Sequence, residues 1–321
     1  MLKRRQLLIA MTLMSAMPSA FPMPGGAAAP EKILLDTDIG SDIDDAVALA
    51  FLLRHPACEL MGITTVTGEP DRRARLAGAL CQIANVKIPV LAGAAIPLVI
   101  PQRQTEAPQA EKIDTRANSA APSGEAIEFL RSTIRKHPGE ITLLAIGPLT
   151  NIALLFRTDP EIPSMLKQLV VMAGKYSDYP TPWGPTEWNA IVDPHATHIV
   201  FNAPVSQARI FGLDITWQVS MDPEAVSRQF SGDPLLETVR DWSEVWFRER
   251  ELLHFHDPLA AAAVFNPEVC RYKRGRINVE LGDPATAGVT HFVPDPESPF
   301  EFAASVNADQ FFRDYFGVFR R

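Results

Sequence analysis

Residues 32–53 read KILLDTDIGSDIDDAVALAFLL, and this stretch sets the start of the fold. Residues 32–35 are mostly apolar and predict a short buried strand. An acidic turn follows at 36–45, and the apolar residues 46–53 predict a helix that ends at His55-Pro56. A strand, a turn and a helix in this order form the first half of a βαβ unit.

The same alternation continues along the chain. Strands are predicted at 60–66, 88–92, 141–146, 169–172 and 208–211, and helices at 72–84, 126–136, 149–156 and 195–202. Residues 241–265 are expected to be mostly helical, and the remainder to form short strands and a final helix. Strands that alternate with helices form parallel sheets. The predicted fold is a single α/β domain, residues 30–321, with an open, mostly parallel sheet flanked by helices. Residues 101–122 lack periodicity and predict a loop or lid over the carboxyl ends of the strands.

Composition narrows the class of protein. Of the 321 residues, 46% are hydrophobic and 21% are charged, and the net charge is −8. This balance is typical of a soluble globular protein and excludes a disordered chain or a multi-span membrane protein. Without a basic cluster beyond the first few residues, nucleic acid is not an expected partner. The three cysteines include no CxxC pair, which argues against a disulfide framework or a zinc site.

The first 29 residues have the pattern of an export signal. Lys3, Arg4 and Arg5 precede an apolar run at 7–17, and three alanines end the segment at Ala29. The run is too short to span a bilayer, which takes about 20 residues. The Arg4-Arg5 pair resembles a twin-arginine signal, although ordinary Sec signals also carry paired basic residues. We expect an exported protein, periplasmic or secreted, without stable membrane insertion after cleavage; an uncleaved N-terminal anchor is the alternative.

The turn at 36–45 contains five aspartates within ten residues. Like charges this close repel one another and raise one another's pKa unless a cation neutralises them. Ca²⁺ takes six to eight oxygen ligands and would do so. The turn is not an EF-hand loop, because a strand precedes it and no Glu stands at the twelfth position. Because the turn lies between an apolar strand and an apolar helix, we interpret it as a metal or catalytic site.

Three other polar clusters stand at the ends of predicted elements. They are His256-Asp257-Pro258, Glu187-Trp188-Asn189, and the turn 147–151, whose plainest interpretation is a helix start capped by Thr150 or Asn151. In open α/β sheets, ligands bind beyond the carboxyl ends of the strands. These clusters are therefore candidates for the same site.

Seven segments together carry a family resemblance. They are DTDIGSDIDDA (36–46), GITTVTG (62–68), IPVLAGAAIPL (88–98), ITLLAIGPLTNIAL (141–154), EWNAIVDPHA (187–196), GLDIT (212–216) and HDPLA (256–260). In this order they resemble the nucleoside hydrolase family, the inosine–uridine-preferring nucleoside N-ribohydrolases. The resemblance implies a Ca²⁺ ion held by the carboxylates of Asp38, Asp45 and Asp257 and by the backbone carbonyl of Ile146. It also implies a homo-oligomer, since family members are commonly dimers or tetramers.

The resemblance also places the substrate, a nucleoside or a related ribosyl compound. Asp42 or Asp44 corresponds to an acidic residue near the ribose hydroxyls, and Glu187 and Asn189 resemble residues that hold them. His256 resembles the histidine that assists the leaving base.

Hydrolysis of an N-glycosidic bond builds oxocarbenium character on the ribose, which a carboxylate-rich pocket stabilises. Ca²⁺ would orient a water and lower its pKa, and Asp38 would accept the proton. Trp183, Trp188 or Tyr176 could stack on the base.

The chain departs from the family pattern at three places. Glu69 stands where family members usually have Asn, and as a further carboxylate near the metal it is a candidate substrate contact. The usual Gly-Asn pair before the Glu-x-Asn segment is absent, and so is the His-Gly stretch expected near 110–120. The altered pocket points to a ribosyl compound other than inosine or uridine as a possible substrate.

Two other functions remain open at this stage. One is an exported protein that binds ribosyl compounds and has lost turnover. The other is a phosphatase of the haloacid dehalogenase type, in which Asp36 would be the nucleophile, Asp38 the acid/base and Mg²⁺ the metal.

Overall fold

The computed structural model describes residues 29–113 and 125–320, and within them a nine-stranded sheet has the order β10-β9-β11-β6-β5-β4-β1-β2-β3. The large sheet contains β1 (Glu31–Thr37), β2 (Cys58–Thr65), β3 (Val90–Ala92), β4 (Ile141–Ala145), β5 (Gln168–Met172), β6 (Ala208–Phe211), β9 (Cys270–Val279), β10 (Thr290–Pro294) and β11 (Phe300–Val306). Seven neighbouring strands, β11-β6-β5-β4-β1-β2-β3, run parallel to one another. In this large sheet, the antiparallel pairings are those of β9 with β10 and with β11. The mostly parallel sheet of a single α/β domain is confirmed.

Strand β1 is an interior strand, third from the β3 edge of the sheet, between β2 and β4. Ile33, Leu34 and Leu35 have no exposed surface. A parallel strand is covered by helices on both faces, so it is apolar throughout instead of alternating. This explains why the short run at 32–35 is so uniform in sequence.

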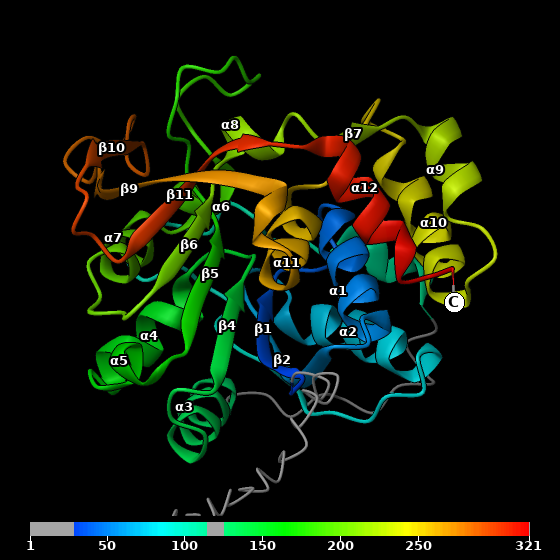
Figure 1. The fold of residues 1–321 in the computed structure, drawn as a ribbon, viewed down its shortest axis with the longest axis horizontal. Coiled ribbons are helices and arrows are strands. Elements are labelled where there is room, and N and C mark those ends of the chain that lie inside the picture. Colours follow the sequence, from blue (N-terminus) through cyan, green and yellow to red (C-terminus); the bar gives the residue numbers. More distant parts are fainter. Residues whose placement is uncertain (1–28, 114–124, 321) are drawn as a thin grey trace, which may run out of the picture.

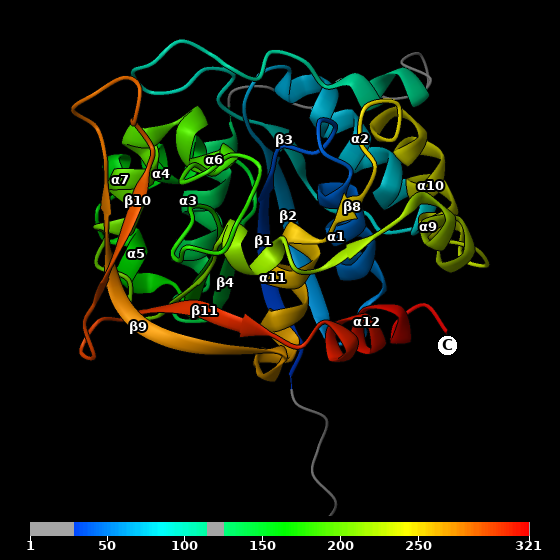
Figure 2. The same ribbon diagram turned by 90° about the horizontal axis from the view of Figure 1, so that it is seen from above.

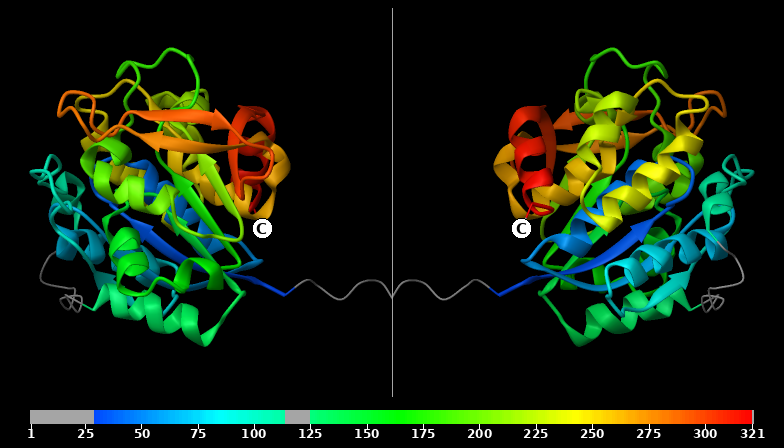
Figure 3. Two further views of the ribbon diagram at one scale, coloured as in Figure 1. Left: turned by 90° about the vertical axis from the view of Figure 1, so that its left-hand side faces the viewer. Right: turned by 90° about the vertical axis from the view of Figure 1, so that its right-hand side faces the viewer.

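Helices cover both faces of the sheet (Figure 1). They are α1 (Asp44–Arg54), α2 (Pro70–Ile83), α3 (Ala126–Lys136), α4 (Thr150–Thr158), α5 (Ile162–Met165), α6 (Trp188–Val192), α7 (Pro194–Phe201), α8 (Leu213–Thr216), α9 (Pro223–Gln229), α10 (Pro234–Trp246), α11 (His256–Phe265) and α12 (Ala308–Gly317). One buried apolar cluster joins α1, α2, α10, α11 and α12 to the sheet, and another joins α3, α4 and α7. Figure 3 shows the antiparallel strands at the end of the molecule opposite α3.

The largest difference from the predicted elements lies at 241–265. Helix α10 ends at Trp246 and α11 begins at His256. Between them the polar run Glu249-Arg250-Glu251 interrupts the apolar pattern, and the two-residue strand β8 (Leu253–His254) pairs with β7 (Ser220–Met221). This break delivers His256 to the start of a buried helix.

The carboxyl ends of β1, β4 and β5 meet at one edge of the sheet. The segment that follows β3 (cyan) crosses this edge and contains the 3₁₀ helix η1 (Pro108–Lys112) (Figure 2). Residues 1–28 of the expected export signal (1–29) and residues 114–124 of the expected lid lie outside the described residues. Within the described ranges, no helix has both the length and the apolar character needed to cross a membrane.

Candidate active site

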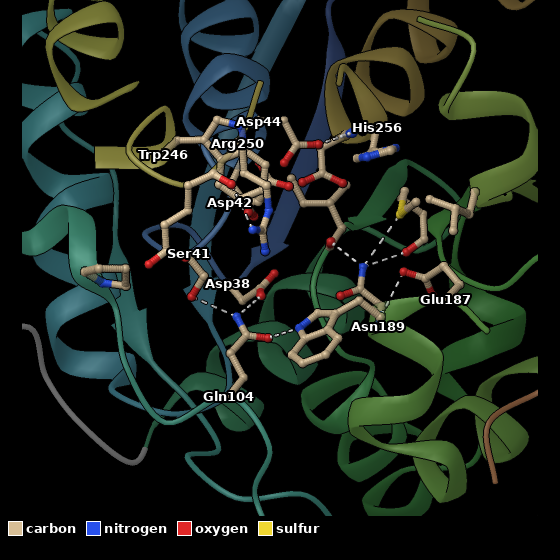
Figure 4. A pocket seen from close by; sticks show the side chains of 18 of the residues that line it. Asp38, Ser41, Asp42, Asp44, Gln104, Glu187, Asn189, Trp246, Arg250 and His256 are labelled. Atoms are coloured by element: carbon tan, nitrogen blue, oxygen red, sulfur yellow. Dashed lines mark hydrogen bonds between the residues drawn. The ribbon is translucent and has the colours of Figure 1, made fainter. Parts of the chain in front are cut away.

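A pocket of about 450 Å³ opens at the carboxyl ends of the strands. It brings together ten of the residues expected at the site: Asp38, Asp42, Asp44, Asp45, Ile146, Glu187, Trp188, Asn189, His256 and Asp257. These residues come from four separate segments of the chain. Figure 4 shows Asp42, Asp44 and His256 in the upper part of the pocket, Asp38 below them beside Gln104, and Glu187 and Asn189 at the lower right.

Three buried carboxylates converge in this pocket. Oxygens of Asp44, Asp45 and Asp257 lie within 4.8 Å of one another. Helices α1 and α11 start side by side, and the backbone N–H of Asp257 donates to Asp44 Oδ2 at 3.0 Å. Burial first, and then repulsion from neighbouring aspartates, raises the pKa of each carboxyl well above its usual value; the neighbours include Asp42 for Asp44 and Asp38 for Asp45. Buried carboxylates in this number are normally paired with cations or coordinate metals, and an all-oxygen donor set suits a hard divalent ion.

Asp38 stands at the end of β1 but outside this group of three. Its Oδ2 accepts a hydrogen bond from Gln104 Nε2 at 2.6 Å. Burial raises the pKa of Asp38, and the nearby Arg73 opposes that rise. A methyl group at Gly147 would lie 2.8 Å from Asp38 Oδ1, so the turn after β4 packs directly on this carboxylate.

Glu187 and Asn189 are fixed by the start of α6. Glu187 Oε1 accepts from the N–H of Asn189 at 2.8 Å, and Oε2 accepts from Ala190 at 2.9 Å and Gly174 at 2.7 Å. Burial raises the pKa of Glu187 to about 7, and these three donors oppose the rise. The Asn189 amide donates to the carbonyl of Ile146 at 2.8 Å, which leaves that oxygen its second lone pair.

His256 is buried and held by a hydroxyl. Its Nδ1 lies 2.7 Å from Thr216 Oγ1. When the hydroxyl donates to Nδ1, the single ring proton of the neutral imidazole is on Nε2. Burial, and secondarily the neighbouring His254, lowers the pKa of His256 to about 3. His254 stacks on Trp217 with 3.7 Å between ring centroids, and the edge of Trp183 meets Trp217 at 5.4 Å.

A sequence model described as inosine-uridine preferring nucleoside hydrolase matches residues 33–313. The chain belongs to this family. The inosine-uridine preferring nucleoside hydrolases of Leishmania major and Crithidia fasciculata are each 33% identical to it, over 81% of this chain and 87% of theirs. A solved plant nucleoside hydrolase has the same fold, with a TM-score of 0.78 at 24% identity over 90% of this chain and 98% of that one. As a member of the nucleoside hydrolase family, the chain is a hydrolase that acts on N-glycosyl bonds.

Two carboxylates singled out in the sequence do not line the pocket of this nucleoside hydrolase. Glu69, an expected substrate contact, pairs with Arg72 at 2.8 Å and accepts from the N–H of Ala107 at 3.1 Å. Asp36 has no exposed surface, and its Oδ1 accepts from Asn151 and Thr64. A carboxylate enclosed in this way is a poor nucleophile for a phosphate ester, which argues against the phosphatase.

Three other residues have roles different from those predicted. Neither Thr150 nor Asn151 caps α4: Thr150 donates to Asp193 at 2.8 Å, and Asn151 donates to Asp36 at 2.7 Å. Tyr176, a candidate for stacking on the base, donates its hydroxyl to the carbonyl of Ala173 and packs against Phe302. Of the three candidates for stacking, Trp183 and Trp188 line the pocket.

Several pocket residues were missed by sequence reasoning. Gln104 comes from the aperiodic segment after β3, Trp246 is the last residue of α10, and Arg250 lies in the break between α10 and α11. Figure 4 shows Arg250 extending toward Asp42. No local motif marks these positions, because they reach the pocket from loops or from the end of a helix.

Proposed function

We propose that this protein catalyses the Ca²⁺-dependent hydrolysis of the N-glycosidic bond of ribonucleosides, or of a related ribosyl compound, to free base and ribose. The observation that carries the proposal is the convergence of Asp44, Asp45 and Asp257 in a pocket large enough for a nucleoside. Membership of the nucleoside hydrolase family supports the reaction.

Asp38, Asp45, Asp257 and the Ile146 carbonyl would hold the metal ion. Asp44 would be an additional ligand or a ribose contact, because its carboxylate belongs to the converging group. When bound, Ca²⁺ would supply a Lewis acid that orients a water, lowers its pKa and attracts the ribose hydroxyls.

The chain's own groups would perform the remaining steps. Gln104 occupies Asp38 Oδ2, so Oδ1 is the atom that accepts the proton of the attacking water. The surrounding carboxylates stabilise positive charge on the ribose as the glycosidic bond breaks. Because these carboxylates are already in place, they need not rearrange when the glycosidic bond breaks.

The ribose and the base would contact opposite parts of the pocket. Glu187 already accepts three backbone N–H groups, so its remaining lone pairs and Asn189 would hold ribose hydroxyls, together with Asp42 or Asp44. His256 would donate a hydrogen bond from its Nε2–H to the departing base and so stabilise the charge that develops on it, and Trp183 and Trp188 would stack on the base. Glu69 would affect the substrate only indirectly, because its carboxylate binds Arg72 and the backbone N–H of Ala107.

We also propose the setting in which the enzyme acts. Removal of an export signal at 1–29 would release the catalytic domain, residues 30–321, to the periplasm or the exterior. The mature protein would be a homo-oligomer that acts on a small molecule and binds neither nucleic acid nor membrane.

Paired substrates test the reaction class. The enzyme should release p-nitrophenol from p-nitrophenyl riboside and not from p-nitrophenyl phosphate; the reverse preference would support a phosphatase. Calorimetry with nucleosides, run beside an assay for free base, addresses the binding protein. Tight binding of a nucleoside that is never cleaved would contradict the proposed hydrolysis.

A further inference from the structure

We propose that Gln104 is a positioning residue that joins the aromatic wall at Trp188 to the carboxylate of Asp38. This inference rests on the proposed function, in which Asp38 accepts the proton of water and Trp188 contacts the base. Gln104 lies in a segment that resembles no motif, and it assists through its neighbours without itself reacting.

The amide of Gln104 makes three hydrogen bonds in the pocket. Its Nε2 donates to Asp38 Oδ2 at 2.6 Å and to Ser41 Oγ at 2.9 Å. Its Oε1 accepts from Trp188 Nε1 at 2.5 Å. Both amide protons are therefore used, and the side chain is only 7% exposed (Figure 4). A neutral amide suits this place because a carboxylate could not donate to Asp38.

The backbone that carries Gln104 is fixed to the same turn as Asp38. Arg73 donates to the carbonyl of Glu106 at 3.0 Å, and Ser41 Oγ donates to that carbonyl at 3.0 Å. Further along, the N–H of Gln109 donates to the carbonyl of Gly40 at 3.1 Å. The backbone that follows Gln104 is therefore anchored, so the amide of Gln104 would stay in place if the Trp188 ring moved.

This contact has one consequence for each partner. For Asp38, donation to Oδ2 fixes the carboxylate rotamer and leaves Oδ1 as the free oxygen. Trp188 is 44% exposed, so packing alone does not fix its ring. The hydrogen bond from its Nε1 to Gln104 Oε1 fixes the plane of that ring. A base stacked on that ring is then held at a set distance from the water that Asp38 activates. Positioning errors of about 1 Å can cost about 100-fold in rate.

A double-mutant cycle tests the connection. We expect Gln104→Met to lower kcat by about 10- to 100-fold with KM changed less than about threefold, because binding survives and alignment does not. Trp188→Phe keeps an aromatic ring and removes the N–H, so it should lower kcat in the wild type but add little in the Gln104→Met background. Gln104→Glu keeps the acceptor for Trp188 and loses the donor to Asp38, so it should lower kcat as well.

Gln168 provides the matched control. It is buried like Gln104, at 6% exposed, and its Nε2 donates to Thr142 Oγ1 at 3.3 Å at the amino end of β5, away from Asp38 and Trp188. Gln168→Met removes this bond, and its kcat should stay within about threefold of wild type. Thermal unfolding of each variant checks that the comparison is between folded enzymes.

The indole N–H signals of the five tryptophans give a readout that does not depend on activity. The signal lost in Trp188→Phe identifies Trp188. It should move upfield in Gln104→Met, as its hydrogen bond is lost, and stay near its wild-type position in Gln104→Glu and Gln168→Met.

Two results would overturn the inference: an unmoved Trp188 signal in Gln104→Met, or kcat losses from Gln104→Met and Trp188→Phe that simply multiply. Failure of the wild-type enzyme to release any base is a different outcome, because it would remove the proposed function itself.

Discussion

Among the residues that the structure describes, Arg73 is the largest side chain with no exposed surface, and it lies beneath the acidic turn. Its guanidinium donates to the carbonyls of Asp38, Ile39, Thr67 and Glu106. One cation thereby holds three segments of the pocket together and offsets part of the negative charge on Asp38 and Asp45. A buried charge is tolerated only when its hydrogen bonds are satisfied in this way.

Arg73→Met should destabilise the fold by about 3 kcal/mol or more, because it leaves several buried carbonyls without donors. Urea unfolding at pH 7 measures the change. The adjacent Arg72, 41% exposed and paired with Glu69, is the control, and Arg72→Met should cost less than about 1 kcal/mol. Equal losses in the two variants would contradict the role given to Arg73.

His256→Ala should reduce hydrolysis of a natural nucleoside much more than hydrolysis of p-nitrophenyl riboside. The natural base is a poor leaving group that needs the hydrogen bond from Nε2–H, whereas p-nitrophenolate leaves without one. Steady-state kinetics with both substrates measures the difference. Equal losses on the two would refute assistance of the leaving base by His256.

At the scale of elements, the active site depends on how closely the turn after β4 approaches the end of β1. A Cβ at Gly147 would lie 2.8 Å from Asp38 Oδ1 and 2.9 Å from the Asp38 backbone nitrogen. Gly147→Ala should therefore displace Asp38 and lower kcat by about tenfold or more. Gly78→Ala is the control: a Cβ there meets nothing within 4 Å, and alanine favours the helix. A fully active Gly147→Ala enzyme would show that Asp38 tolerates movement.

Asp159, the residue after α4, binds two arginines of α3, and this contact should make the free energy of unfolding depend on pH. Arg135 binds its two oxygens at 2.6 and 2.7 Å, and Arg131 binds at 2.9 Å. Hydrogen bonds from Arg135 lower the pKa of Asp159 to about 2, whereas an unfolded chain titrates near 3.9. A lowered folded pKa stabilises the fold above about pH 4, and this stabilisation is lost as pH falls through 2.

Asp159→Asn should cost about 1 kcal/mol at pH 7, a modest value because both arginines are partly exposed. The difference in free energy of unfolding between Asp159→Asn and the wild type should become smaller as the pH falls from 4 to 2. Urea unfolding at several pH values measures it, with the exposed Asp241→Asn as control, for which a change under about 0.5 kcal/mol is expected. A gap that is constant with pH would exclude the carboxylate as its source.

At the scale of the whole molecule, the sheet could be predicted well because buried parallel strands are uniformly apolar. The pocket was predictable where one motif supplies it, as in the acidic turn, the Glu187-Trp188-Asn189 segment and His256-Asp257. Gln104, Arg73 and Thr216 were not, because they act on partners 66, 35 and 40 residues away. Contacts of this kind depend on tertiary packing. Glu69 is the opposite case: it stands next to a family motif in the sequence, but the fold directs its carboxylate away from the pocket.

The most direct measurement is a panel of nucleosides scored for free base, with chelator and after Ca²⁺ is restored. We expect at least one ribonucleoside to be cleaved, with activity lost to the chelator and recovered with Ca²⁺. Asp38→Ala should be inactive under both conditions and should bind Ca²⁺ more weakly by calorimetry. Release of base that is indifferent to the chelator, or retained by Asp38→Ala, would contradict a metal-dependent hydrolase built on this acidic turn.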